Sequence, residues 1–337
     1  MECPHKRVDF AGGLGVSCEF HVPVENEAGY CRRPEYFRCI EDVNRLAFPL
    51  SYSSVSNFLT CHNLFYLRNI RGIETRNEAT SSPIKMGQLW DKCLQKLLGA
   101  DINLNDTVAA YEIENNDVAK VRALYRAYKT LEIAVDEGYE LQATFRKPVQ
   151  IYEIEADEEG SKILITGIYD RKYPTAFAEN KLSGRPEMYF DIFFLQSQIG
   201  AYFIADDNLE YVDMEVVRTP ALKQAKNKDE GPEDFEERIY KDIIARPSAY
   251  FLGFNNKTNR YGKRFYRSEF NLGEIRLRFQ HVSREIHEAC FFDGWYLNDR
   301  ACNNVLPGIA CDMLSVCRYG TMAENIYRIR PIPAELL

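Results

Sequence analysis

The sequence predicts an α/β protein in which a mixed β-sheet is flanked by helices on both faces. Stretches with apolar residues at the helical period occur between shorter runs in which apolar and polar residues alternate, as in β-strands. Such a succession of helices and strands is typical of layered α/β folds. Hydrophobic residues make up 45% of the 337-residue chain, including 21 Tyr and 20 Phe, which is ample for a packed core.

The length allows one large domain or two smaller ones, and the composition changes near residue 45. Residues 1–45 are rich in Gly, Cys and charge, whereas residues 46–337 contain the periodic segments. No run approaches the roughly 20 apolar residues of a membrane span. The first residues, MECPHKRVDF, lack the apolar stretch of a signal peptide. We therefore expect a soluble, intracellular (cytoplasmic) protein with no membrane partner.

Four of the ten cysteines lie in the first 40 residues: Cys3, Cys18, Cys31 and Cys39. A segment this short, with few aliphatic side chains, needs a cross-link or a metal ion to fold. In an intracellular chain, such residues are more often metal ligands or free thiols than disulfides. They predict a tetrahedral Zn²⁺ site, in which His5 or His21 could replace one ligand. The alternative is a set of unliganded thiols.

Three helices are predicted before the first strand of the sheet, at residues 50–71, 86–98 and 116–137. The first contains Cys61, which by itself would most often be a buried thiol. Asp91 lies at the border of the apolar face of the second helix. There a carboxylate could reach the edge of a cleft or simply be solvated.

Alternation of apolar and polar residues predicts strands at residues 145–155, 162–169 and 209–217. Helical periodicity predicts further helices at residues 187–205, 235–244 and 272–291. The break Tyr-Pro-Thr within residues 163–181 predicts a β-hairpin. The order of these elements favours a mixed sheet.

The hairpin contains the residues with the clearest chemistry. Asp170 ends its first strand, and Glu179 and Lys181 lie on its second. Since residues two apart on a strand face the same side, Glu179 and Lys181 should point together into the space beside Asp170. Two carboxylates and an ammonium could there hold a divalent cation and a water next to a phosphate. In the next helix, Gln198 and Tyr202 are four residues apart and share a face.

Residues 255–278 interleave basic side chains with Tyr261, Phe265 and Tyr266. The basic residues are Lys257, Arg260, Lys263, Arg264 and Arg267. This combination suits a groove that follows phosphates and stacks bases, and the alternative is solvated charge on a hairpin. The net charge of −8 argues against nonspecific coating of nucleic acid, but a local basic channel would be sufficient for an enzyme.

Six segments together resemble the PD-(D/E)XK nuclease superfamily: SYSSVSNFLTCHNLFYL, MGQLWDKCLQ, GIYD, ENK, QIGAY and GWYLNDRACNNVLPGIACDMLSVC. The resemblance extends from residue 50 to the C-terminus. It is closest to the branch of RecB-type nuclease domains, CRISPR-adaptation nucleases and exonuclease V that contains an iron–sulfur cluster. It implies a restriction-endonuclease-like core with helical additions, preceded by the Cys-rich module of residues 1–45.

The resemblance implies roles for five residues of the hairpin and the helix that follows it. Asp170 and Glu179 become ligands of Mg²⁺ or Mn²⁺. Lys181 becomes the residue that orients or activates the attacking water and stabilises developing charge. Gln198 and Tyr202 would line the site against the DNA backbone.

The sequence departs from the family's pattern at Asp91, where the family usually has a histidine metal ligand. Oxygen suits Mg²⁺ or Mn²⁺ at least as well as nitrogen does. A metal-binding role is therefore still expected for Asp91, and the preference among metals could differ from the family's.

The resemblance also implies a [4Fe–4S] cluster on four thiolates: Cys61, Cys302, Cys311 and Cys317. The cluster would join two parts of the chain that are 240 residues apart, and closing a long loop is where a cross-link can stabilise most. We expect a structural cluster, and a zinc ion on the same thiolates is the alternative.

We therefore expect a metal-dependent DNase, an exonuclease or end-processing enzyme rather than a site-specific one. Its substrate would be single strands or DNA ends, in DNA repair, recombination or phage and defence DNA processing. One alternative is a catalytically inactive nucleic-acid-binding or scaffold protein, which the acidic net charge and Asp91 favour. Another is a nuclease subunit active only with a helicase, recombinase or other DNA-processing partner.

Overall fold

The computed structural model describes most of the chain from residue 49 to residue 329 and two short segments before it. The described residues are 21–24, 27–31, 49–76, 81–150, 162–192, 197–225, 230–292, 294–303, 311–320 and 326–329. The first two segments form an antiparallel pair, β1 (His21–Val24) and β2 (Glu27–Cys31). Cys3, Cys18 and Cys39 lie outside the described residues, so the N-terminal zinc site stays a prediction.

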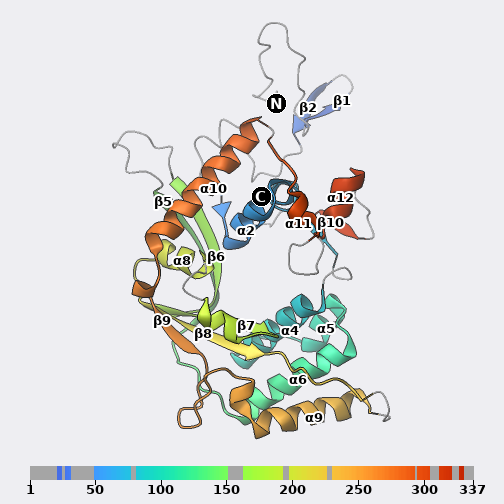
Figure 1. The fold of residues 1–337 in the computed structure, drawn as a ribbon, viewed down its shortest axis with the longest axis vertical. Helices are drawn as coiled ribbons and strands as arrows, with labels where there is room; N and C mark the ends of the chain where they lie inside the picture. The colour runs from blue at the N-terminus through green and yellow to red at the C-terminus, as the bar shows by residue number, and fades with distance from the viewer. Residues whose placement is uncertain are drawn as a thin grey trace.

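A six-stranded mixed sheet lies at the centre of the described chain, as the sequence predicts (Figure 1). Its strands are β3 (Pro49–Leu50), β5 (Glu140–Gln150), β6 (Lys162–Lys172), β7 (Ala176–Ser183), β8 (Tyr211–Arg218) and β9 (Lys263–Tyr266). The order is β3-β6-β7-β8-β9, and β5 pairs with the other edge of β6. The β3–β6 and β7–β8 pairs are parallel and the others antiparallel.

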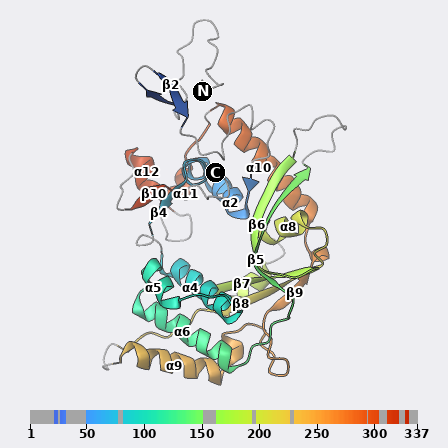
Figure 2. The same cartoon turned by 180° about the vertical axis from the view of Figure 1, so that it is seen from behind.

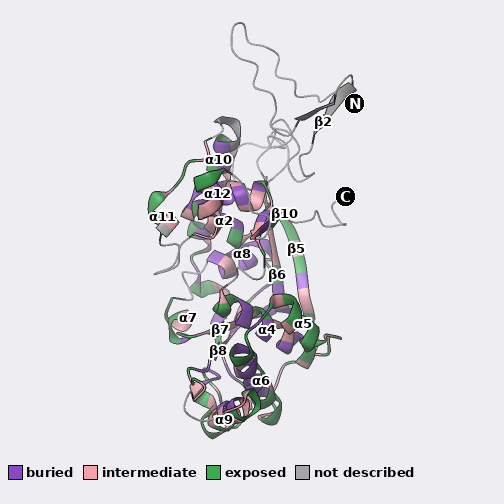
Figure 3. Ribbon diagram, turned by 90° about the vertical axis from the view of Figure 1, so that its right-hand side faces the viewer, coloured by how far each residue is buried: buried purple, intermediate pink, exposed green. Residues whose placement is uncertain are grey.

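Helices cover the two faces of this sheet. On one face, α8 (Ser197–Ala205) packs against β7 and β8, and α10 (Leu272–Phe292) packs on α8. On the other, α4 (Ser82–Leu97), α6 (Asn115–Thr130) and α9 (Pro232–Ala245) share one apolar core with β8. The short helix α5 (Leu104–Tyr111) lies against α4. Figure 3 shows buried residues in α6, α8 and the neighbouring strands.

The predicted helix at residues 50–71 is wrong in one respect, because it is interrupted. Helix α2 (Tyr52–Thr60) is capped by Ser51 and ends at Cys61, whose backbone is extended. Helix α3 (His62–Phe65) and a π-helical turn (Tyr66–Ile70) follow. At the break, the carbonyl oxygen of Thr60 accepts a hydrogen bond from Asn298 and the amide of Asn63 donates to Tyr296. Contacts with a segment distant in sequence thus replace the helical ones.

The single buried helix predicted at residues 187–205 is also wrong. Its first part is the separate short helix α7 (Glu187–Asp191), in which Met188 is 51% exposed, whereas α8 is buried at every residue except the half-buried Gln198. The other predicted helices agree closely, except that α6 ends at Thr130, seven residues early. Glu132, just beyond it, has a left-handed backbone with φ 47°.

The last described elements of the chain lie close in space to residues 52–75. Helices α11 (Asp299–Asn303) and α12 (Leu314–Tyr319) lie beside α2, and β10 (Tyr327–Ile329) pairs with β4 (Ile73–Thr75), as seen from both sides in Figures 1 and 2. A small apolar core that includes Cys61, Met313 and Tyr327 joins them. Among the described helices, none is long and apolar enough to cross a membrane.

Candidate active site

The predicted hairpin is present, but its two strands separate almost at once. β6 and β7 pair only at Arg171 with Ala178 and at Lys172 with Phe177. Beyond this point β7 continues along β8, while the same edge of β6 pairs next with β3, at Ile165 and Leu164. The hairpin therefore opens into a fork, and Asp170 is the first residue of β6 inside it.

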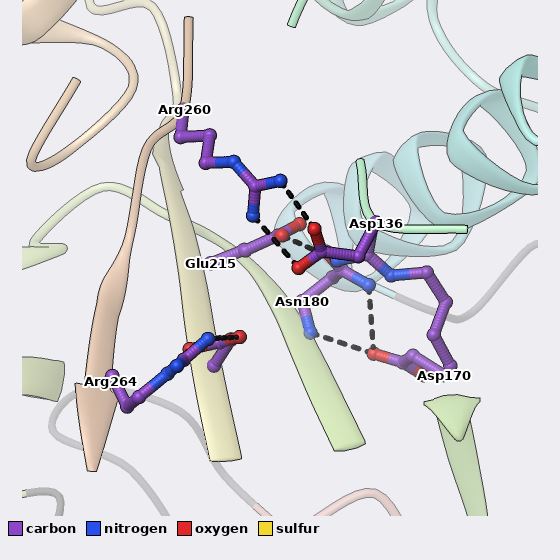
Figure 4. A network of polar contacts seen from close by, with 8 residues as sticks. Asp136, Asp170, Asn180, Glu215, Arg260 and Arg264 are labelled. Carbon is purple, nitrogen blue, oxygen red and sulfur yellow. Dashed lines mark hydrogen bonds and ion pairs between the residues drawn. The ribbon is translucent and has the colours of Figure 1, made fainter. Parts of the chain in front are cut away.

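Polar side chains fill the fork where strand pairing stops. Asp170 Oδ2 accepts a hydrogen bond from the backbone amide of Asn180 at 2.7 Å, which Figure 4 shows. From α8, the Tyr202 hydroxyl donates to the carbonyl oxygen of Ile168 at 2.9 Å. The Asp170 carboxylate thus accepts a β7 backbone hydrogen bond that a carbonyl oxygen of a neighbouring strand would otherwise accept. The opening of the sheet fixes the position of Asp170.

Glu179 and Lys181 share one side of β7, as their spacing predicts. Lys181 Nζ lies 2.5 Å from Glu179 Oε1, and Gln198 Nε2 donates to the same oxygen at 2.9 Å. Gln198 Nε2 also lies 3.0 Å from the Tyr202 hydroxyl, which confirms that these two α8 residues share a face. The structure therefore brings together all five of the residues predicted on the hairpin and α8.

Burial and mutual charge set the electrostatics of this group. Burial raises the pKa of Glu179 to about 7, although the Lys181 ammonium opposes the rise. Burial acts against the charge of Lys181, but Glu179 outweighs it and raises the pKa of the ammonium above its usual value. Lys181 therefore stays charged in the neutral pH range.

Asp91 of α4 lies at the edge of the same group. Burial, and then the nearby negative charge of Asp170, raise the pKa of the Asp91 carboxyl, and Lys181 acts in the opposite direction. Gln95 holds this carboxylate by donating from Nε2 to Asp91 Oδ2 at 2.7 Å. The structure thus places Asp91 within electrostatic range of Asp170 and Lys181 in the hairpin, as expected for the edge of its helix.

The donor set of this site fits a hard divalent cation. Carboxylate oxygens are the ligands that Mg²⁺ and Mn²⁺ prefer. Glu179 Oε2 is buried and has no hydrogen-bond partner in the described part of the chain, so one oxygen is free to accept a cation. The other carboxylate contacts are to protein donors, and among the described residues no three His, Cys, Asp or Glu side chains are arranged to hold a metal ion. Cation binding therefore requires the carboxylates to turn from these donors.

The four predicted cluster cysteines meet at one small cavity between α2, α11 and α12. Cys61, Cys302, Cys311 and Cys317 line it together with apolar side chains. Two N–H groups point at the sulfurs: the amide of Asn298 lies 3.4 Å from Cys61 Sγ, and Asn63 Nδ2 lies 3.2 Å from Cys317 Sγ. Donors of this kind are typical neighbours of iron–sulfur thiolates.

Three of the four thiols are protonated at neutral pH when no metal is bound, because burial raises their pKa. Burial raises the pKa of Cys311 to about 11 and also raises the pKa of Cys302 and Cys317. Four cysteines and two N–H donors thus converge on this cavity, although the described residues contain no group of three or more His, Cys, Asp or Glu side chains placed to hold a metal ion.

The basic segment differs from the predicted base-stacking groove. Phe265 is buried in the core under α8 because β9 pairs with β8, and Tyr261, which precedes β9, is buried in the core of α4, α6 and α9, whereas Tyr266 is 54% exposed. Three of its arginines lie in ion pairs, Arg260 with Asp136, Arg264 with Asp213 and Arg267 with Asp207. Lys263 lies over the Phe265 ring, and Lys257 is exposed.

Sequence reasoning missed several residues that shape the site. Asn180 provides the amide that holds Asp170, and Gln95 orients Asp91. Arg171 is 2% exposed and pairs with Glu215 of β8. An arginine inside a predicted strand that is otherwise largely apolar was the sequence feature that could have indicated this residue. Its partner, Glu215, lies 44 residues further along the chain.

A mixed sheet that forks around a carboxylate–lysine group defines the core of a nuclease of the restriction-endonuclease type. The sequence matches the PD-(D/E)XK nuclease superfamily over residues 49–318, and the chain belongs to this family. The matched range begins at β3 and ends in α12, so it includes the fork and all four cluster cysteines. The search of curated proteins finds no match to the chain.

Proposed function

We propose that the protein is a metal-dependent DNA nuclease that acts as an exonuclease or end-processing enzyme. The observation that supports this most directly is the fork, where Asp170, Glu179 and Lys181 meet and one buried carboxylate oxygen has no hydrogen-bond partner among the described residues. A folded protein rarely leaves such an oxygen unpaired without a ligand or water to satisfy it. Repair, recombination or phage and defence DNA processing are the settings that suit this activity.

Asp170 and Glu179 would hold Mg²⁺ or Mn²⁺, with Asp91 as a third oxygen ligand. When bound, the cation lowers the pKa of a water and neutralises charge on the phosphate. Lys181 keeps its positive charge beside Glu179, so it orients the attacking water and stabilises the charge that develops in the transition state. Gln198 fixes Glu179 by its hydrogen bond to Oε1.

Tyr202 supports this arrangement from α8. It accepts a hydrogen bond from Gln198 and donates to the carbonyl oxygen of Ile168 inside the fork. The ring also contacts Tyr169, Phe177 and Phe145. Tyr202 thereby links the position of Gln198 to the backbone of β6.

For the cysteine site, we propose a structural [4Fe–4S] cluster on Cys61, Cys302, Cys311 and Cys317. Its role is to hold α2, α11 and α12 together, and no electron transfer is needed for hydrolysis. A zinc ion on the same thiolates is the alternative, and elemental analysis of anaerobically purified protein separates the two. Zinc at residues 1–45 would appear as additional metal that persists when Cys61 is replaced.

The activity is tested with the Asp170→Asn variant on end-labelled linear DNA and on closed circular DNA. The wild type should cleave linear DNA with Mg²⁺ or Mn²⁺ and leave circles intact, while Asp170→Asn should lose cleavage with an unchanged melting temperature. Asp207→Asn is the matched control, because the Asp207 side chain is 87% exposed and contacts only Arg267 among the residues described. Full activity of Asp170→Asn would exclude the assignment.

A second candidate function is a catalytically inactive DNA-binding or scaffold subunit. The net charge of −8 and the three ion-paired arginines of the basic segment favour it, since they leave less positive surface for DNA. This candidate predicts retention of DNA without cleavage in either metal ion. Cleavage that appears only after addition of a helicase or recombinase captured with the protein would instead identify a subunit of a larger nuclease.

A further inference from the structure

The side chains of β6 change face at Asp170. Before it, Tyr169 packs on the α8 side, with its ring centroid 4.9 Å from that of Tyr202. After it, Arg171 lies on the opposite side and pairs with Glu215. In a regular strand, residues two apart face the same way. Gln142, at this level of the neighbouring strand β5, has a left-handed backbone with φ 51°.

Arg171 spans the back of the fork. It is opposite Ala178 in the β6–β7 pair, and Glu215 is opposite Asn180 in the β7–β8 pair. The ion pair therefore crosses β7 diagonally and joins β6 directly to β8. The small side chain of Ala178 leaves room for this crossing. Glu215 is thus a cross-strand neighbour of Asn180, whose backbone amide holds Asp170 (Figure 4).

The Arg171–Glu215 ion pair is buried beside a polar cavity of about 190 Å³. Tyr128 and Tyr261 lie near the pair. Arg171 Nε has no hydrogen-bond partner in the described part of the chain, and a cavity of this size can hold water for it. Buried ion pairs often add little stability compared with apolar side chains of similar size. Stability alone therefore gives little reason for this pair.

We propose that Arg171 is a positioning residue: its pairing with Glu215 fixes the change of face in β6 that presents Asp170 to the metal site. Tyr169 anchors β6 on one side of the sheet and Arg171 on the other, with Asp170 between them. Loss of the second anchor lets β6 untwist, and Asp170 then moves away from the Asn180 amide. This role rests on the proposed nuclease function, because it assumes that Asp170 binds the catalytic cation.

The test compares Arg171→Met, Glu215→Leu and the double variant that replaces the pair by apolar side chains. Each full-length protein is measured for Mn²⁺ affinity by titration, for kcat and KM on linear DNA, and for melting temperature. The double variant should regain most of the wild-type melting temperature but keep a loss of at least about tenfold in Mn²⁺ affinity and kcat, with KM unchanged. Lys241→Met, which removes an exposed ion pair with Glu237 on α9, should leave all four quantities unchanged.

Two results would overturn the proposal. If the double variant binds Mn²⁺ and cleaves DNA like the wild type, Arg171 has no positioning role. If the wild type shows no Mn²⁺ binding that depends on Asp170, the nuclease assignment itself fails, and this role fails with it. Should the double variant not fold, Glu215→Gln decides, because weaker Mn²⁺ binding with cooperative melting supports the proposal and wild-type binding contradicts it.

Discussion

At the scale of single residues, Glu179 determines how the site responds to pH. Its side chain is 2% exposed, and burial raises the pKa of Glu179 to about 7. A folded-state pKa above the unfolded value means that the metal-free protein gains stability from this group at low pH and loses it as pH rises toward 7. A cation reverses this preference, because it binds only the ionised carboxylate.

Mn²⁺ affinity should therefore depend on pH in a defined way. Below pH 7 the proton competes for Glu179, and the affinity should fall by about tenfold per pH unit between pH 7 and 5.5. Above pH 7 it should level off. Isothermal titration of the wild type across this range measures how the affinity changes with pH. Glu179→Gln is the comparison variant, because Gln has no carboxyl group that binds and releases a proton. An affinity that stays constant from pH 5.5 to 7.5 contradicts the assignment of Glu179 as a ligand.

Lys181→Met should reduce kcat roughly 10²–10³-fold, because it removes the ammonium proposed to orient the attacking water and to stabilise the developing charge. The same change leaves Glu179 buried without its partner, which raises the pKa of Glu179 further and weakens Mn²⁺ binding. Single-turnover cleavage at saturating Mn²⁺ separates the two effects. Lys172→Met is the matched control, since Lys172 pairs with Asp206 beyond the fork and should retain wild-type kcat. Equal activity of both variants would contradict the role of Lys181.

At the scale of secondary-structure elements, α8 and the fork depend on close packing around Gly167. A Cβ atom at Gly167 would lie 2.6 Å from the Phe145 ring and 2.7 Å from the Tyr202 ring. Both rings are part of the aromatic contacts that hold α8 on β5 and β6. The absence of a side chain at this position therefore lets Tyr202 reach the Ile168 carbonyl oxygen.

Gly167→Ala should destabilise the protein by about 1–3 kcal/mol and lower kcat, because the displaced Tyr202 no longer supports Gln198. Urea unfolding and cleavage rates measure the two effects. Gly87→Ala in α4 is the control: a Cβ there has nothing within 4 Å, and helix propensity predicts an unchanged or higher stability. Wild-type stability and activity in Gly167→Ala would show that the fork tolerates a shift of α8.

Variants at the cysteine site test whether an iron–sulfur cluster or a zinc ion joins α2 to α11 and α12. Cys61→Ser should reduce iron from about four atoms per chain to near zero and lower the melting temperature. Cys93→Ala is the matched control, because Cys93 is a buried thiol of the α4–α6 core and should leave the iron content unchanged. Retention of iron in Cys61→Ser would remove this residue from the ligand set, and zinc in place of iron would correct the identity of the metal.

At the scale of the whole molecule, local patterns predicted the layers and most of the active site. The spacing of Glu179 and Lys181 and that of Gln198 and Tyr202 are determined by strand and helix periodicity, so the sequence was sufficient for them. The break at Cys61 and the fork at Asp170 were not predictable in this way. In both places a contact is made with a residue distant in sequence: Asn298 donates to Thr60 at the break, and Glu215 pairs with Arg171 beside the fork.

The surroundings of the basic segment, residues 255–278, also could not be predicted from local sequence. Its arginines and aromatics have the composition of a nucleic-acid groove, and composition alone does not show that Asp136 and Asp213 lie beside Arg260 and Arg264. Pairing of β9 with β8 places Arg264 opposite Asp213, and a backbone hydrogen bond from Ala134 to Asn259 lies next to the Arg260–Asp136 pair. These tertiary contacts, which composition does not show, pair the arginines with acids.

The most direct test of the whole account is chelator-sensitive cleavage of end-labelled linear DNA by the anaerobically purified, full-length protein. The account predicts cleavage with Mg²⁺ or Mn²⁺, none with EDTA, and none for Asp170→Asn although its iron content and melting temperature match the wild type. DNA that is bound but remains uncut with both metal ions would contradict it and would support the inactive scaffold instead.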